Sequence, residues 1–193
     1  MKKEELSKYE MIYSDSIEFM GFTLYRIRAL KDFSNVNSGD LGGYICDYEN
    51  LSQYGDAWVY GDALVYGDAR VYGDARVYGD ARVYGDARVS GDAWVYGDAL
   101  VSGDALVSGD ARVSGDALVS GQKSIITILD IGSERGCLTI HSDSKIGVRV
   151  TRGCFTGTIE EFLSAVEKTH SDNIHGKIYR AAIDMAKIQF EID

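Results

Sequence analysis

The residues from Gly55 to Ala117 read GDAWVY GDALVY GDARVY GDARVY GDARVY GDARVS GDAWVY GDALVS GDALVS GDARVS GDA. Gly-Asp-Ala occurs eleven times in this stretch, always six residues apart. Alanine and valine lie two positions apart in each unit, so both side chains point to the same face of a short strand. Gly-Asp is a turn pair in which glycine permits a positive φ. The period therefore predicts short strands joined by corners, with alanine and valine inside.

This pattern resembles the hexapeptide-repeat proteins, in which an aliphatic residue is followed four positions later by a small one, as Val71 is by Ala75. The resemblance covers residues 53–121. It implies a mainly β fold, a left-handed parallel β-helix with three hexads, or about 18 residues, in each triangular coil. Eleven hexads then give about 3.7 coils, and the regular section is roughly 18 Å long at about 4.8 Å per coil.

The prediction divides the chain into three parts. Residues 1–40 form an N-terminal cap, residues 41–124 form the β-helix, and residues 125–193 form a C-terminal α+β unit. Both flanks are expected to act as caps, because an open solenoid end exposes an unpaired strand edge.

The sequence of each flank predicts particular elements. Before the repeats, we expect a short helix over residues 3–11 and a β-hairpin around Gly21. After the repeats, strands should lead into two helices, the first opened by a capping box, Thr158-x-x-Glu161. The expected strands span residues 125–131, 137–141 and 147–151, and the expected helices span residues 159–169 and 173–190.

Residues eighteen apart are expected to stack in columns on the outer surface. One column contains four residues: Trp58, Arg76, Trp94 and Arg112. Its alternation of indole and guanidinium groups favours cation–π contacts. A second face carries Arg82 and three leucines: Leu64, Leu100 and Leu118. Exposed apolar columns indicate a binding partner. Hexapeptide-repeat proteins are often trimers, so the resemblance implies a homotrimer, and an unidentified protein or small ligand is the alternative partner.

The C-terminal unit holds all three histidines of the chain. Cys154, His170 and Asn173 have the types and order of a thiol nucleophile, a base and an orienting amide. Arg149 and Arg152 are candidates for receiving an anionic ligand or a nucleotide. The structural interpretation is that Cys154 is a buried strand end and that Asn173 or Asp172 caps the second helix.

The activities of the resembled family do not carry over to this chain. Its acyltransferases use a histidine in a loop between coils, and its carbonic anhydrases hold zinc with histidine. Here residues 1–140 contain no histidine, and no loop interrupts the eleven units. Cys137, His141 and Cys154 have irregular spacing and no CxxC motif, so we expect no metal and no cofactor. The sequence favours a non-enzymatic binding or scaffold protein, with an enzyme or anion-binding protein centred on the C-terminal unit as the alternative.

The formal charge of −10 disfavours direct binding to nucleic acid. Residues 53–121 hold eleven aspartates and five arginines, a net charge of −6. This is one charge per roughly 3 Å of rod against one per about 1.7 Å of duplex DNA, so an acidic decoy is a weaker third hypothesis. Three cysteines without a disulfide pattern, and no apolar run of 18 residues, predict a soluble cytoplasmic protein that does not bind membranes.

The flanking sequences resemble uncharacterised repeat proteins of bacteria and of their phages or prophages. The residues that carry this resemblance are LGGYI at 41–45 and GCFTGT at 153–158. It implies a protein of the host cytoplasm that binds or inhibits a host factor.

Overall fold

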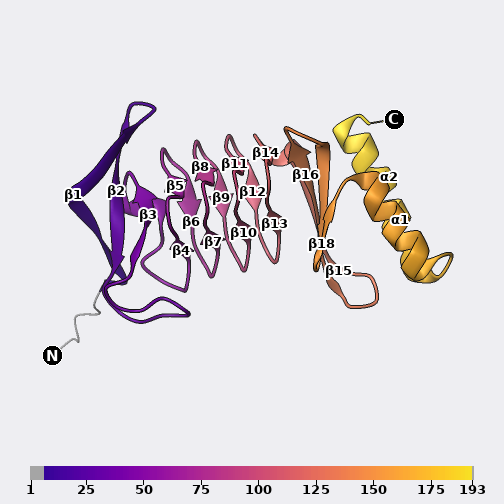
Figure 1. Cartoon of the computed structure of the whole chain (residues 1–193), viewed down its shortest axis with the longest axis horizontal. Coiled ribbons are helices and arrows are strands. Elements are labelled where there is room, and N and C mark those ends of the chain that lie inside the picture. Colours follow the sequence, from indigo (N-terminus) through magenta and orange to yellow (C-terminus); the bar gives the residue numbers. More distant parts are fainter. Residues whose placement is uncertain (1–6, 193) are drawn as a thin grey trace.

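In the computed structural model, which describes residues 7–192, the chain forms an elongated rod (Figure 1). A central stack of coils lies between a hairpin at the N-terminal end and a sheet with two helices at the C-terminal end. The central section consists of two-residue strands, one in each repeat unit. These are β4 (Trp58–Val59), β5 (Leu64–Val65), β6 (Arg70–Val71), β7 (Arg76–Val77), β8 (Arg82–Val83), β9 (Arg88–Val89), β10 (Trp94–Val95), β11 (Leu100–Val101), β12 (Leu106–Val107), β13 (Arg112–Val113) and β14 (Leu118–Val119).

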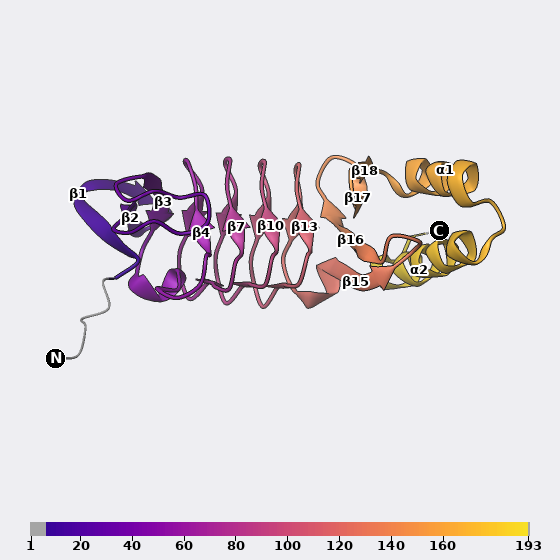
Figure 2. The same ribbon diagram turned by 90° about the horizontal axis from the view of Figure 1, so that it is seen from below.

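Strands three units apart pair in parallel, so residues eighteen apart are neighbours, as Trp58 and Arg76 are. The coil therefore has three faces. Face 1 contains β4, β7, β10 and β13, which lie in one row in Figure 2. Face 2 contains β5, β8, β11 and β14, and face 3 contains β6, β9 and β12. The mainly β parallel β-solenoid, with about 18 residues per coil, is thus confirmed.

The alanine and the valine of every repeat unit point inward and are buried. The corner glycines have positive φ, for example 72° at Gly73. A Cβ atom at Gly73 would also come within 3.0 Å of the Gly91 backbone nitrogen in the next coil. Both the backbone conformation and the close stacking of corners therefore require glycine at this position.

The N-terminal segment continues the sheet of face 2. β1 (Tyr9–Phe19) and β2 (Phe22–Ala29) form the expected hairpin around Gly21, and β3 (Leu41–Ile45) pairs with β2 and then in parallel with β5. Residues 3–6 of the expected helix over 3–11 lie outside the described residues. The rest of that prediction is wrong, because Tyr9 already begins β1. A 3₁₀ turn, η1 (Tyr48–Asn50), connects β3 to the coils.

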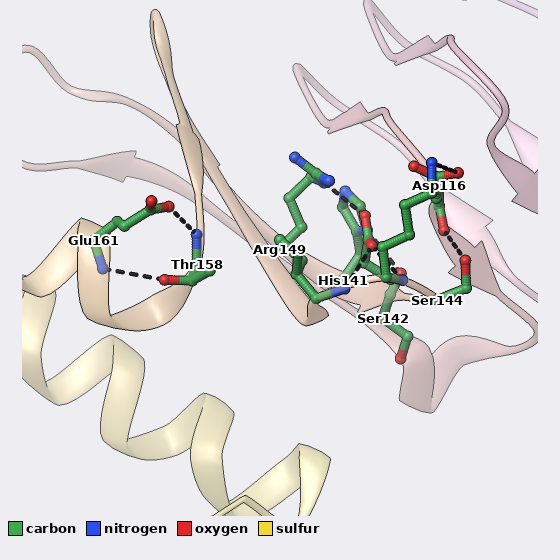
Figure 3. A network of polar contacts seen from close by, with 10 residues as sticks. Asp116, His141, Ser142, Ser144, Arg149, Thr158 and Glu161 are labelled. Atoms are coloured by element: carbon green, nitrogen blue, oxygen red, sulfur yellow. Dashed lines mark hydrogen bonds and ion pairs between the residues drawn. The ribbon is translucent and has the colours of Figure 1, made fainter.

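After the coils, η2 (Gln122–Ser124) leads into a four-stranded antiparallel sheet and two helices. The elements are β15 (Ile125–Ile131), β16 (Gly136–Asp143), β17 (Gly147–Arg152), β18 (Phe155–Gly157), α1 (Ile159–His170) and α2 (Ile174–Phe190). The short strand β18 was not expected. The predicted capping box is present: the Glu161 amide donates to Thr158 Oγ1, and the Thr158 amide donates to Glu161 Oε2 (Figure 3).

The C-terminal sheet has two unlike faces. Leu138, Ile140 and Val150 pack with both helices in a core of their own. The alternate residues face the end of the solenoid, where the Arg112 amide donates to Thr139 Oγ1 at 3.1 Å. A polar sheet surface therefore covers the open end of the coils. Neither helix of residues 7–192 combines the length and apolar character needed to cross a membrane.

Candidate functional sites on the solenoid and the C-terminal unit

The expected column on face 1 exists. Trp94 lies in register between Arg76 and Arg112. The guanidinium carbons of these arginines lie 5.4 Å and 5.2 Å from the centroid of the Trp94 ring. Each such contact contributes about 0.5–1 kcal/mol at an exposed site. The column therefore stabilises the outer surface, as well as presenting an indole and two cations.

The first member of this column is not on the surface. Trp58 is only 1 % exposed. It makes edge-to-face contacts with Phe33 and Tyr9, at centroid distances of 5.3 Å and 6.0 Å. The N-terminal segment thus covers Trp58, which belongs to the core and offers no surface to a partner.

Face 2 shows the same difference between its two ends. Leu64 is 7 % exposed and packs in a cluster with Tyr44 and Tyr66. Towards the other end, Leu100 is half-buried and Leu118 is 42 % exposed. Leu106, at the same end of face 3, is 45 % exposed. Leu100 and Leu118 are register neighbours on adjacent strands of face 2, and we call these two residues the leucine patch.

In the C-terminal unit, Arg152, Cys154 and His170 line one pocket of about 450 Å³ between the β17–β18 turn and the helices. Nε of Arg152 donates to the Tyr179 hydroxyl at 3.1 Å, and the His170 ring lies 5.6 Å from the Tyr179 ring. Cys154 is exposed and lies in the turn, so its interpretation as a buried strand end is wrong. The sequence did not predict this turn because it did not predict β18.

The other two candidate ligand residues have structural partners elsewhere. Nε of Arg149 lies 2.7 Å from the buried Asp143 carboxylate, at the junction with the solenoid (Figure 3). Asn173 caps α2, as expected, and its Oδ1 accepts from the amides of His175 and Gly176. The side-chain oxygen of Asn173 is therefore committed to the helix, and it does not orient His170.

The junction between solenoid and C-terminal sheet contains a second pocket, of about 240 Å³, that the sequence did not predict. Arg112 of β13 and Arg152 of β17 both line it, although they lie forty residues apart in the chain. The only sequence signal was indirect. Thr139 and Thr151 alternate with apolar residues in their strands, which is typical of a sheet with one polar face.

Buried titratable groups at this junction are held in their neutral or paired forms. Burial raises the pKa of the Cys137 thiol and lowers the pKa of His141. Burial alone would raise the pKa of Asp143, but hydrogen bonds from Arg149 and from two backbone amides bring it below its usual value. Within residues 7–192, no group of three or more His, Cys, Asp or Glu side chains is arranged to hold a metal ion.

Comparison with known proteins points to the same architecture. Four overlapping segments, residues 57–73, 69–82, 81–97 and 93–109, match the family model described as YdcK Beta solenoid repeat. No curated protein matches the chain. The repeat region is thus similar to that family, and together with the stacked parallel coils this similarity makes the chain a β-solenoid repeat protein.

Proposed function

We propose that this protein is a non-enzymatic scaffold that self-associates through the leucine patch. The supporting observation is the unequal cover of equivalent positions in the repeat. The chain's own N-terminal segment covers Trp58 and Leu64, whereas Leu106 and Leu118 have no such cover. The same position of the repeat unit is thus buried within the chain at the N-terminal end and exposed at the C-terminal end. We infer that a second copy of the chain covers the exposed leucines.

The shape of the patch suits a second rod. Leu100 and Leu118 are each followed on face 2 by a serine, where Leu64 is followed by Tyr66. Small side chains beside the leucines permit close approach of another flat face. The patch is nevertheless small for a stable protein interface, so we expect assembly that depends on protein concentration.

The hexapeptide-repeat resemblance supports three copies with parallel axes. Copies that each carry a formal charge of −10 repel one another. This repulsion is screened by salt, whereas apolar contacts are not. Assembly should accordingly strengthen as salt is raised from low to physiological concentration.

The test is the solution mass as a function of protein concentration, by light scattering and sedimentation. The wild-type protein should reach about 64 kDa, three times the chain mass of 21.2 kDa. The double variant Leu100→Glu, Leu118→Glu should stay at the mass of one chain. Leu41→Glu is the matched control, because Leu41 is 57 % exposed at the opposite end of the rod. A wild-type protein that stays monomeric at the highest attainable concentration would contradict the proposal.

A host protein is the alternative occupant of the patch, and the phage-like flanks support it. It would become the leading hypothesis if the wild-type protein were monomeric. An acidic decoy is less well supported, because five arginines share the outer surface of the repeats with the aspartates and some corner aspartates are paired, as Asp116 is with Lys145 at 2.9 Å.

A further inference from the structure

The junction pocket lies on the side of face 1, whereas the leucine patch lies on face 2. Its walls come from the last coil and from the C-terminal sheet: Asp110 and Arg112 precede and begin β13, and Thr151 and Arg152 end β17. The pocket is therefore formed only when the C-terminal unit is docked on the solenoid.

The two arginines that line this pocket have guanidinium groups that are held in place without a carboxylate partner. Nη1 of Arg112 donates to the Gly153 carbonyl at 2.9 Å, and the same group lies over the Trp94 ring. Nη2 of Arg152 donates to the Ile131 carbonyl at 3.2 Å, and its Nε donates to Tyr179. Neither arginine forms an ion pair with any carboxylate of residues 7–192. Each guanidinium has five N–H groups, so both retain donors for a ligand.

The pocket also contains a buried polar group that the protein leaves unsatisfied. Thr151 is 4 % exposed, and its hydroxyl has no hydrogen-bond partner. Buried polar groups in native proteins nearly always have a partner, and an ordered water or a ligand in the adjacent pocket would supply one to Thr151. Cys137, another lining residue, does not oppose an anion, because burial raises the pKa of its thiol.

We propose that the junction pocket binds a small molecule through an oxyanion, either a phosphate or a carboxylate. The two arginines receive the oxyanion, since guanidinium groups pair with both through parallel N–H···O bonds. The Thr151 hydroxyl donates to the same group. Asp110, the carboxylate in the lining, faces a hydroxyl or amino group of the ligand. A volume of about 240 Å³ suits a small metabolite rather than a polymer.

A ligand in this position would join the two parts of the rod, because Arg112 belongs to the solenoid and Arg152 to the C-terminal sheet. A group that binds only the folded, docked state raises the stability of that state by mass action. The melting temperature of the helices is therefore a measure of binding. This readout is independent of the self-association proposed above, which is measured as mass.

The experiment is a titration of the full chain with inorganic phosphate and, separately, with acetate, each against chloride at equal ionic strength. Calorimetry and the melting temperature at 222 nm are the readouts. At least one anion should bind and raise the melting temperature, and the better anion identifies the oxyanion class. Arg152→Gln should weaken binding at least tenfold. Arg88→Gln is the charge-matched control, because Arg88 is exposed on face 3 and should not affect binding.

Thr151→Val provides a second variant that keeps the side-chain shape. It should weaken anion binding severalfold while leaving the unliganded protein at least as stable, because it removes an unpaired buried hydroxyl. The proposal is overturned if neither anion binds, or if Arg88→Gln weakens binding as much as Arg152→Gln. If Arg152→Gln does not fold, Thr151→Val decides, and unchanged binding in that variant overturns the proposal.

Discussion

The two ends of the solenoid are closed in different ways. At the N-terminal end, the hairpin extends the sheet of face 2, and Tyr9, Ile27 and Trp58 belong to the same apolar core as the valines of the coils. At the C-terminal end, a sheet with its own core lies across the coils and contacts them through hydrogen bonds, while Ile125 of β15 joins the apolar core of the coils. The comparison indicates that the N-terminal cap and the coils unfold as one unit, whereas the C-terminal unit can separate from them.

This difference can be followed with two optical signals. Both tryptophans of the chain, Trp58 and Trp94, lie in the solenoid. Both α-helices of residues 7–192 lie in the C-terminal unit. Tryptophan fluorescence therefore reports on the coils, and circular dichroism at 222 nm reports mainly on the C-terminal helices.

The largest effect is expected for Trp58→Ala, which should destabilise the coils by about 4 kcal/mol, the usual cost of removing a fully buried aromatic side chain. Trp94→Ala is the matched control, since it stands in an identical GDAWVY unit but is only half-buried. Its cost should be clearly smaller. Urea unfolding followed by the fluorescence of the remaining tryptophan measures both variants. Equal costs would show that the N-terminal cap does not seal the core.

Asp143→Asn should destabilise the C-terminal unit by about 3 kcal/mol, because it leaves the Arg149 guanidinium unpaired in a buried site. The loss should appear at 222 nm before it appears in tryptophan fluorescence. Asp116→Asn changes the same junction, but its partner Lys145 is exposed, so a much smaller effect is expected. Coincident transitions of both signals in Asp143→Asn would contradict the separate unfolding of the C-terminal unit.

Asn173→Ala should cost about 1 kcal/mol, the usual effect of losing an N-cap. The change should be confined to the 222 nm transition, since α2 contributes nothing to the core of the coils. Asp172→Ala, at the neighbouring position, removes only an exposed ion pair with Arg180 and should have less effect. Thermal unfolding of the two variants gives the comparison.

The smallest effect is a dependence on pH. Nδ1 of His141 donates to the Ser142 carbonyl at 2.9 Å, while its buried Nε2 has no partner. Burial lowers the pKa of His141 below its ordinary 6.5, with Asp143 opposing and Arg149 reinforcing that direction. As pH falls below about 6.5, the unfolded chain binds a proton that the folded chain does not, so stability decreases.

The carboxylate of Asp143 does not contribute in this window, since its pKa lies below 3.8 and the stability it provides is lost only at lower pH. Unfolding at 222 nm between pH 7 and pH 5 should therefore show a loss of stability in the wild-type protein. His141→Gln should reduce the slope. An unchanged slope in this variant would assign the dependence to another group.

Much of the fold could be predicted from the repeat, because a six-residue period with fixed alanine, valine and glycine positions is compatible with few backbone conformations. Three of the four strands and both helices of the C-terminal unit also followed from local patterns, such as the Thr158–Glu161 capping box. Burial could not be predicted in the same way. Trp58 and Trp94 occupy the same position in identical repeat units. Trp58 belongs to the core only because the N-terminal segment packs over it.

The candidate ligand site was predicted only in part. Arg152, Cys154 and His170 do share a pocket, but Arg149 pairs with Asp143 and Asn173 caps a helix. The junction pocket was missed because it joins the last coil to a strand forty residues later. No local sequence pattern predicts that the C-terminal sheet docks on the last coil.

The coil of eighteen residues also fixes how the length of the rod can change. Removing one coil, for example residues 73–90, would move the C-terminal unit towards the hairpin by about 4.8 Å and leave it facing the same direction. Removing a single hexad would instead turn every later face by a third of a revolution and place leucines where the tryptophan and arginine column now runs. The length of the rod can therefore change only in steps of one coil if the N-terminal hairpin and the C-terminal unit are to keep their relative orientation.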